Sequence, residues 1–163
     1  MKRLYIVRHG KSSWDLEGTQ DIDRPLKERG IFDAHKMAKY IDRELKKPDL
    51  MISSNAIRAL HTAVIFHRVM NLSPSVLTIN PDLYHADTNE ILDVIYGVDD
   101  MVENLMIFGH NPGFTDFSNY LSTLNLMNLP TTGLVTLDFE IQKWTEIGRD
   151  KLMKELFDIP KNL

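Results

Sequence analysis

The chain has 163 residues, a length typical of one domain whose core needs no metal or disulfide support. Its apolar content of 43% is ordinary for a soluble protein, and the net charge of −4 excludes a general attraction to nucleic acid or acidic membranes. The absence of cysteine excludes disulfides, a thiolate nucleophile and Cys-based metal centres. We find no signal peptide or membrane-spanning stretch, so we expect residues 1–163 to form a single cytoplasmic domain.

Strand and helix patterns alternate up to about residue 125. The apolar run at residues 4–7 predicts a first strand. A polar loop follows, and apolar residues at helical spacing from Ala34 to Leu45 predict a helix that ends before Pro48. Residues 50–52 predict a second strand. The first helix is therefore expected to cover one face of a sheet.

Two further strands and helices follow. Residues 53–55 offer N-cap candidates for a helix that carries Ala59 and Met70. Residues 76–79 predict a third strand, and residues 105–108 predict a fourth.

The helices after the third and fourth strands are amphipathic. Asp87 and Glu90 have the spacing of a capping box, which predicts a helix through Ile95. Apolar positions from Phe117 to Leu124 predict the next helix.

The pattern changes beyond Pro130. Apolar residues from Val135 to Phe139 alternate with polar ones, as expected of a half-exposed antiparallel or edge strand, and residues 143–158 are expected to extend that edge. The predicted fold is therefore α/β. It is a single three-layer α/β/α sandwich with a mostly parallel central sheet and an antiparallel C-terminal edge.

Polar residues follow two of the predicted strands in the same layout. Arg8, His9 and Gly10 follow the first strand, and His110 follows the fourth. In open α/β sheets, ligands bind outside the carboxyl ends of the strands, so both histidines are expected at one rim. Arg58, in the first turn of the second helix, is expected at the same rim.

Such a cluster suits a phosphoryl group. Arginine offers a planar fork of donors to phosphate oxygens, and a helix N-terminus adds partial positive charge. A neutral imidazole attacks phosphorus at neutral pH, which makes His9 the candidate nucleophile of a phosphohistidine intermediate. Arg8, Arg58 and, if protonated, His110 would stabilise the transition-state charge.

Several stretches resemble the histidine phosphatase superfamily, the phosphoglycerate mutase-like fold, and within it the SixA-like phosphohistidine phosphatases. The similar stretches are residues 8–15, 23–30, 58–63 and 109–113, and the similarity continues to residues 160–161. The resemblance implies that Arg8, His9, Arg58 and His110 form the phosphate pocket, with His9 as the covalent nucleophile and with no metal or other cofactor. Gly10 stands where many SixA-like chains have Ala, and Asn55 where many have Pro; neither change removes a functional group.

Other residues of these motifs are candidates for phosphate or substrate contact. They are Gly10, Lys11, Ser12, Arg24 and Asn111. A structural role is the alternative for Lys11, Ser12 and Arg24. Trp14 and Tyr84 are candidates for the mouth of the site, or for packing.

A general acid is the least determined part of the predicted site. Family members that act on phosphate esters carry a Glu or Asp between the second Arg and the second His, and Asp87 and Glu90 lie in that segment. The capping box is the alternative explanation for both, and we retain Asp87 as the catalytic candidate. His85 and Asp87 lack a third ligand at metal-binding spacing, so no metal site is predicted.

Three functions remain open. The first is a metal-independent phosphatase that removes phosphate from phosphohistidine in a protein, through His9. The second is a phosphatase of small phosphate monoesters with the same pocket, which requires a working acid. The third is a non-catalytic phosphate-binding module. The expected partner is a phosphohistidine-containing protein or a small phosphorylated substrate, with no nucleic acid or membrane, and no sequence feature sets the oligomeric state.

Overall fold

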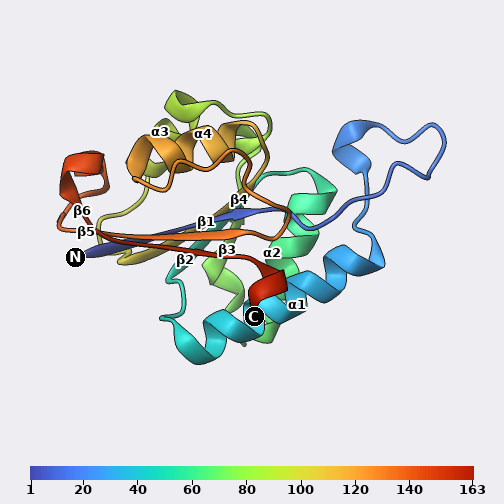
Figure 1. Cartoon of the computed structure of the whole chain (residues 1–163), viewed down its shortest axis with the longest axis horizontal. Helices are drawn as coiled ribbons and strands as arrows, with labels where there is room; N and C mark the ends of the chain where they lie inside the picture. The colour runs from blue at the N-terminus through green and yellow to red at the C-terminus, as the bar shows by residue number, and fades with distance from the viewer.

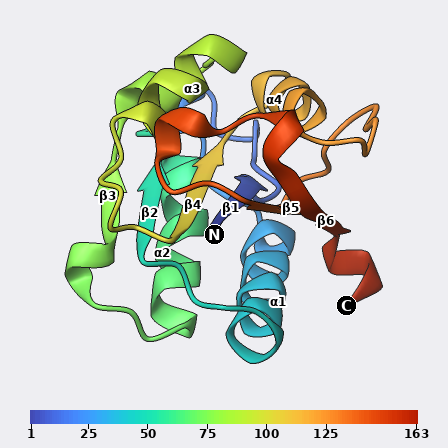
Figure 2. The same cartoon turned by 90° about the vertical axis from the view of Figure 1, so that its left-hand side faces the viewer.

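A computed structural model describes residues 1–163 and contains one six-stranded sheet. The strands are β1 (Lys2–Arg8), β2 (Leu50–Ser53), β3 (Leu77–Ile79), β4 (Asn104–Gly109), β5 (Leu134–Phe139) and β6 (Leu152–Asp158). Figure 2 shows their order across the sheet, β3-β2-β4-β1-β5-β6. The first four strands are parallel to one another; β5 pairs antiparallel with β1, and β6 pairs antiparallel with β5.

Helices cover both faces of the sheet. They are α1 (Glu28–Glu44), α2 (Ile57–Val69), α3 (Thr88–Tyr96) and α4 (Gly113–Leu121). Helices α1 and α2 lie on one face, and α3 and α4 lie on the other (Figure 1). The predicted three-layer α/β/α sandwich is confirmed. None of these helices has the length and apolar content needed to cross a bilayer.

Strand β1 explains why the sheet has two cores. Successive side chains of a strand point to opposite faces. Leu4 and Ile6 therefore pack in the core under α3 and α4, whereas Tyr5 and Val7 pack in the core under α1 and α2. All four residues are fully buried, as in a central parallel strand covered on both sides.

The prediction of a half-exposed or edge strand after Pro130 was partly wrong. Strand β5 is antiparallel, but it lies between β1 and β6 and every one of its residues is buried. Its polar position Asp138 is buried because it forms an ion pair with Arg3 at 2.6 Å. The edge is β6, which is preceded by 3₁₀ turns at Trp144–Glu146 and Arg149–Lys151.

Two helix boundaries also differ from the predictions. Helix α2 is capped by Ala56 without a side-chain hydrogen bond, so none of residues 53–55 is its N-cap. Helix α4 ends at Leu121, which places Leu124 in the following loop, where it still packs against the core. The capping box of Asp87 and Glu90 is present at the start of α3, as predicted.

Candidate active site

The register of β1 and β4 brings the two histidines together. Arg8 is aligned with Gly109, and the His9 N–H donates to the Gly109 carbonyl at 3.1 Å. The rings of His9 and His110 consequently lie 5.2 Å apart, centre to centre. With Arg8 and Arg58 they line a pocket of about 380 Å³ at the carboxyl ends of the parallel strands. The four residues predicted to converge on this rim therefore do so.

His9 is held as a neutral imidazole with its Nε2 atom free of a proton. Its Nδ1 atom lies 2.7 Å from the Gly10 carbonyl, which only accepts, so Nδ1 carries the proton. Arg58 Nε donates to Nε2 at 3.4 Å. Burial, and then the nearby arginine charges, lower the pKa of His9 to about 4. This ring therefore presents a lone pair at neutral pH.

Two other nitrogens of the site are buried without a hydrogen-bond partner. Arg8 donates from Nη1 to the Leu129 carbonyl at 2.9 Å, but its Nε has no acceptor. His110 Nε2 contacts the Ser54 hydroxyl at 2.8 Å, and Nδ1 has no partner. An unpaired buried polar group costs about 1–3 kcal/mol. An anionic oxygen within reach of these nitrogens would offset that cost.

His110 is neutral in this pocket. Burial is the main cause that lowers its pKa, and the adjacent His9 and Arg58 lower it further. The sequence left open a protonated His110 that stabilises charge as a cation. The structure favours a neutral ring, which can stabilise an oxyanion as a hydrogen-bond donor.

Asp21 is a member of the site that the sequence did not reveal. It lies in a 3₁₀ turn (Asp21–Asp23) of the long loop between β1 and α1, and it is the one acidic residue lining the pocket. Its carboxylate accepts from Arg58 Nη2 at 3.0 Å and from Arg24 Nη1 at 3.1 Å. The Tyr84 hydroxyl also donates to it, at 2.5 Å. Asp21 precedes Arg24 by three residues, but its contact with Arg58 spans 37 positions, so no local pattern announces it.

Arg24 lies at the rim and is fully engaged in bonds to the loop. It donates to the Ser13 carbonyl at 3.1 Å and to the Ser12 hydroxyl at 2.6 Å, in addition to Asp21. Its guanidinium also stacks on the Trp14 ring, 3.4 Å from the ring centre. The pocket is lined by Arg24 and by its partners Ser12 and Trp14. The Arg24 guanidinium therefore both lines the pocket and holds the loop in place.

The remaining predicted contact residues occupy different positions. Lys11 and Asn111 line the pocket. The Asn111 side chain is bonded to the Leu129 carbonyl at 2.9 Å and so holds the loop that precedes β5. Gly10 does not line the pocket; its N–H donates to Thr62 Oγ1 at 3.0 Å, which fixes the backbone beside His9.

Asp87 lies outside the main pocket. It lines an adjoining hollow of about 140 Å³ that also contains His85 and His110. Its carboxylate accepts from the Glu90 N–H at 2.9 Å, as an N-cap does. His85 lines both hollows, as His110 and Asn111 also do.

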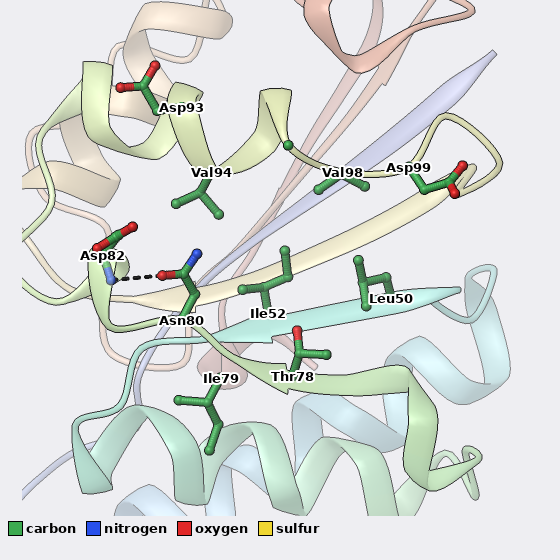
Figure 3. Close-up of a pocket in the computed structure, with 11 residues that line it drawn as sticks. Leu50, Ile52, Thr78, Ile79, Asn80, Asp82, Asp93, Val94, Val98 and Asp99 are labelled. Atoms are coloured by element: carbon green, nitrogen blue, oxygen red, sulfur yellow. Dashed lines mark hydrogen bonds between the residues drawn. The ribbon is translucent and has the colours of Figure 1, made fainter.

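A separate hollow lies at the β2–β3 side of the sheet (Figure 3). Its apolar lining includes Ile52 of β2 and Val94 of α3, which face each other across it, and its acidic lining residues are Asp82, Asp93 and Asp99. None of its lining residues is basic. It therefore lacks the positive charge that favours a phosphoryl group, unlike the pocket around His9.

The fold and this pocket define a class of α/β proteins whose histidine and arginine residues meet at the carboxyl ends of parallel strands. The model of the histidine phosphatase superfamily (branch 1) matches residues 4–85, about half of the chain. An uncharacterised chloroplastic protein of Arabidopsis thaliana is 30% identical over 89% of this chain and 70% of its own length. The chain belongs to the histidine phosphatase superfamily, and this membership supports phosphatase activity.

Solved structures agree on the fold and differ in substrate. A protein of Agrobacterium tumefaciens assigned as the phosphohistidine phosphatase SixA is 27% identical, with a TM-score of 0.76 over 95% of this chain and 97% of that one. A mycobacterial glucosyl-3-phosphoglycerate phosphatase shares the fold at 16% identity, with a TM-score of 0.64 over 98% of both chains. The fold is thus compatible with protein-borne and with small phosphorylated substrates.

Proposed function

We propose that this protein hydrolyses phosphohistidine in proteins, without a metal ion, through a covalent phosphoryl group on His9 Nε2. The observation that carries the proposal is the state of His9. Its Nδ1 proton is committed to the Gly10 carbonyl, and its pKa is low, so Nε2 is available as a nucleophile at neutral pH. The surrounding arginines would attract the phosphoryl group to this atom.

The first step transfers the phosphoryl group to His9. The Nε2 lone pair attacks phosphorus, the P–N bond to the substrate imidazole breaks, and the electron pair leaves with that imidazole. Arg8 and Arg58 hold the equatorial oxygens, and His110 donates a hydrogen bond to one of them. Gly10 supports this step by fixing the ring of His9 through its carbonyl.

The second step releases phosphate. Water attacks the phosphorus on the opposite side, the bond to His9 breaks, and the imidazole recovers its lone pair. Lys11 supplies further positive charge at the pocket wall, whereas Ser12, Arg24 and Asn111 hold the loops that form it. The overall reaction consumes one water for each phosphate released.

The exposure of the rim favours a protein substrate. Trp14 is 68% exposed and Leu16 is 59% exposed, both on the loop that follows β1. In Figure 1 this loop projects away from the sheet, and its residues Trp14, Asp21 and Arg24 form part of the lining of the pocket. A phosphohistidine on a protein surface can reach such a site, whereas a small ester is usually enclosed before it reacts.

The alternatives predict different measurements. A phosphatase of small monoesters prefers p-nitrophenyl phosphate to phosphohistidine, and a binding module binds inorganic phosphate without turnover. A mutase would need an enclosed site that excludes water from the phosphorylated intermediate, which this exposed rim does not offer.

The test compares wild type with His9→Ala, in the presence of a chelator, on a phosphohistidine-bearing protein and on p-nitrophenyl phosphate. We expect wild type to prefer the phosphohistidine and His9→Ala to lose activity on both. Preference for the ester would support the second function. Phosphate binding without hydrolysis by wild type would refute enzymatic activity, and undiminished activity of His9→Ala would refute the nucleophile.

A further inference from the structure

His85 occupies a position in the site that the proposed mechanism has not used. Its backbone has a φ of 53°, in the left-handed region that non-glycine residues seldom adopt. The ring stacks on Tyr84, 4.0 Å between centres, and lines both the main pocket and the hollow beside it. The side chain is 61% exposed, so solvent reaches the ring.

The groups that face His85 come from three other parts of the chain. The Asp21 carboxylate, in the loop after β1, lies 3.6 Å from His85 Nε2. The His110 ring, after β4, lies 6.1 Å away, centre to centre. The Arg58 guanidinium, on α2, donates to the same Asp21 carboxylate, and the Tyr84 hydroxyl also donates to that carboxylate. His85 therefore lies next to the one acidic residue that lines the pocket.

The two carboxyl groups near the pocket are poor candidates for the general acid. Partial burial of Asp21 opposes its ionisation, but hydrogen bonds from Tyr84 and two arginines outweigh burial and lower its pKa well below the usual range. Asp87 accepts a hydrogen bond from the backbone at the start of α3 and lies outside the main pocket. Asp21 therefore carries no readily available proton, and Asp87 is engaged in the helix cap away from His9.

The other histidines are no better suited. His9 is the nucleophile, and its proton is bonded to the Gly10 carbonyl. His110 is buried, and its pKa is lowered. His85 is the one imidazole of the pocket that is both exposed to solvent and adjacent to a carboxylate.

From this arrangement we propose that His85 is the general acid and base of the reaction, in place of Asp87. The proposal rests on the proposed function and specifies its proton transfers. In the first step, protonated His85 gives its proton to the leaving atom as the bond from that atom to phosphorus breaks. In the second step, neutral His85 takes a proton from the water that attacks phosphorus, and phosphate leaves. One proton is donated and one is recovered, so His85 returns to its starting state.

The consequence is a dependence on the leaving group. A phenolate is the conjugate base of a group with a pKa of about 10, so it departs slowly without a proton. A nitrophenolate is far better stabilised and departs without one. General acid catalysis contributes on the order of 10²–10⁴-fold to a step that needs it. Loss of His85 should therefore slow phenyl phosphate much more than p-nitrophenyl phosphate.

The test measures kcat/KM for wild type and His85→Gln on three substrates: the phosphohistidine-bearing protein, phenyl phosphate and p-nitrophenyl phosphate. We expect His85→Gln to lose on the order of 10²-fold on phenyl phosphate and less than about threefold on p-nitrophenyl phosphate. We also expect the alkaline limb of the pH profile to disappear for the phosphohistidine protein. The matched control is His35→Gln, an exposed histidine on α1 outside the site, which should leave all three substrates unchanged.

The outcomes separate this inference from the proposed function. If wild type hydrolyses no substrate, the proposed function fails. If wild type is active but His85→Gln slows all substrates equally, or none, or keeps the alkaline limb, the His85 proposal is wrong. Inorganic phosphate affinity, measured by calorimetry, should be similar in wild type and His85→Gln, because a folded pocket retains its arginines.

Discussion

Arg58 uses both terminal nitrogens of its guanidinium on a single residue, Asp21. Nη1 donates to the Asp21 carbonyl at 2.6 Å and Nη2 to its carboxylate at 3.0 Å, while Nε faces His9. Arg58 is only 3% exposed, so this pair fixes the direction of a buried cation. It also places an ionised carboxylate beside a pocket proposed to bind phosphate, where it repels the ligand.

Replacement of Asp21 should therefore tighten the binding of phosphate. Asp21→Asn keeps a side-chain oxygen that accepts from Arg58 and removes the negative charge. We expect inorganic phosphate to inhibit the variant at a concentration roughly fivefold lower, the equivalent of ~1 kcal/mol, which is about the interaction of two unit charges 4 Å apart in water. The measurement is the inhibition constant for phosphate. Weaker inhibition would mean that Asp21 acts mainly by orienting Arg58.

The His9 ring should remain neutral well below pH 6. Burial and the nearby arginines lower the pKa of His9 to about 4 in the folded protein. In the unfolded chain the same ring is protonated below about pH 6.5. The contribution of His9 to stability is consequently lost as the pH falls from about 6.5 towards 4, at about 1.4 kcal/mol per pH unit. Nitrogen-15 NMR should show a neutral ring at pH 6 with its proton on Nδ1. Half-protonation near pH 6.5 would contradict this assignment.

Two substitutions at Asp87 separate capping from catalysis. Asp87→Ala removes the cap of α3 and should lower the free energy of unfolding by about 1 kcal/mol, whereas Asp87→Asn keeps an acceptor and should cost less. If capping is its only role, Asp87→Asn retains hydrolysis of phenyl phosphate. Urea unfolding and steady-state kinetics give the two values. A stable Asp87→Asn protein without activity on phenyl phosphate would restore Asp87 as the acid predicted from the sequence.

Gly30 is a position where the backbone itself limits substitution. A β-carbon at Gly30 would overlap the Lys11 carbonyl oxygen, in the loop directly after His9 and Gly10. We expect Gly30→Ala to destabilise the fold by about 1–3 kcal/mol and to lower kcat by displacing that loop. The control is Gly97→Ala, where the nearest atom to a β-carbon lies at 3.6 Å and φ is −82°. Urea unfolding of both variants makes the comparison, and equal stability of the two would contradict the close contact.

Much of the fold was predictable because apolar runs and periodic patterns report burial. The four parallel strands and the helix that covers each connection follow local rules of alternation and spacing. The capping box at Asp87 is readable for the same reason, since its two hydrogen bonds join residues only three apart. The burial of β5 was not readable, because the Asp138 carboxylate is buried only through its contact with Arg3, 135 positions away.

The sequence by itself determined that the histidines and arginines of the site follow predicted strands or lie in the first turn of a helix, because apolar runs and helical spacing in the neighbouring residues fix where each strand and helix lies. The rim that unites Arg8, His9, Arg58 and His110 then follows from the general geometry of parallel sheets. Only the tertiary structure decided which groups hold these side chains and in what protonation state. Asp21 and His85 come from loops without periodicity, and burial, which lowers the pKa of His9, depends on the packing of the whole chain.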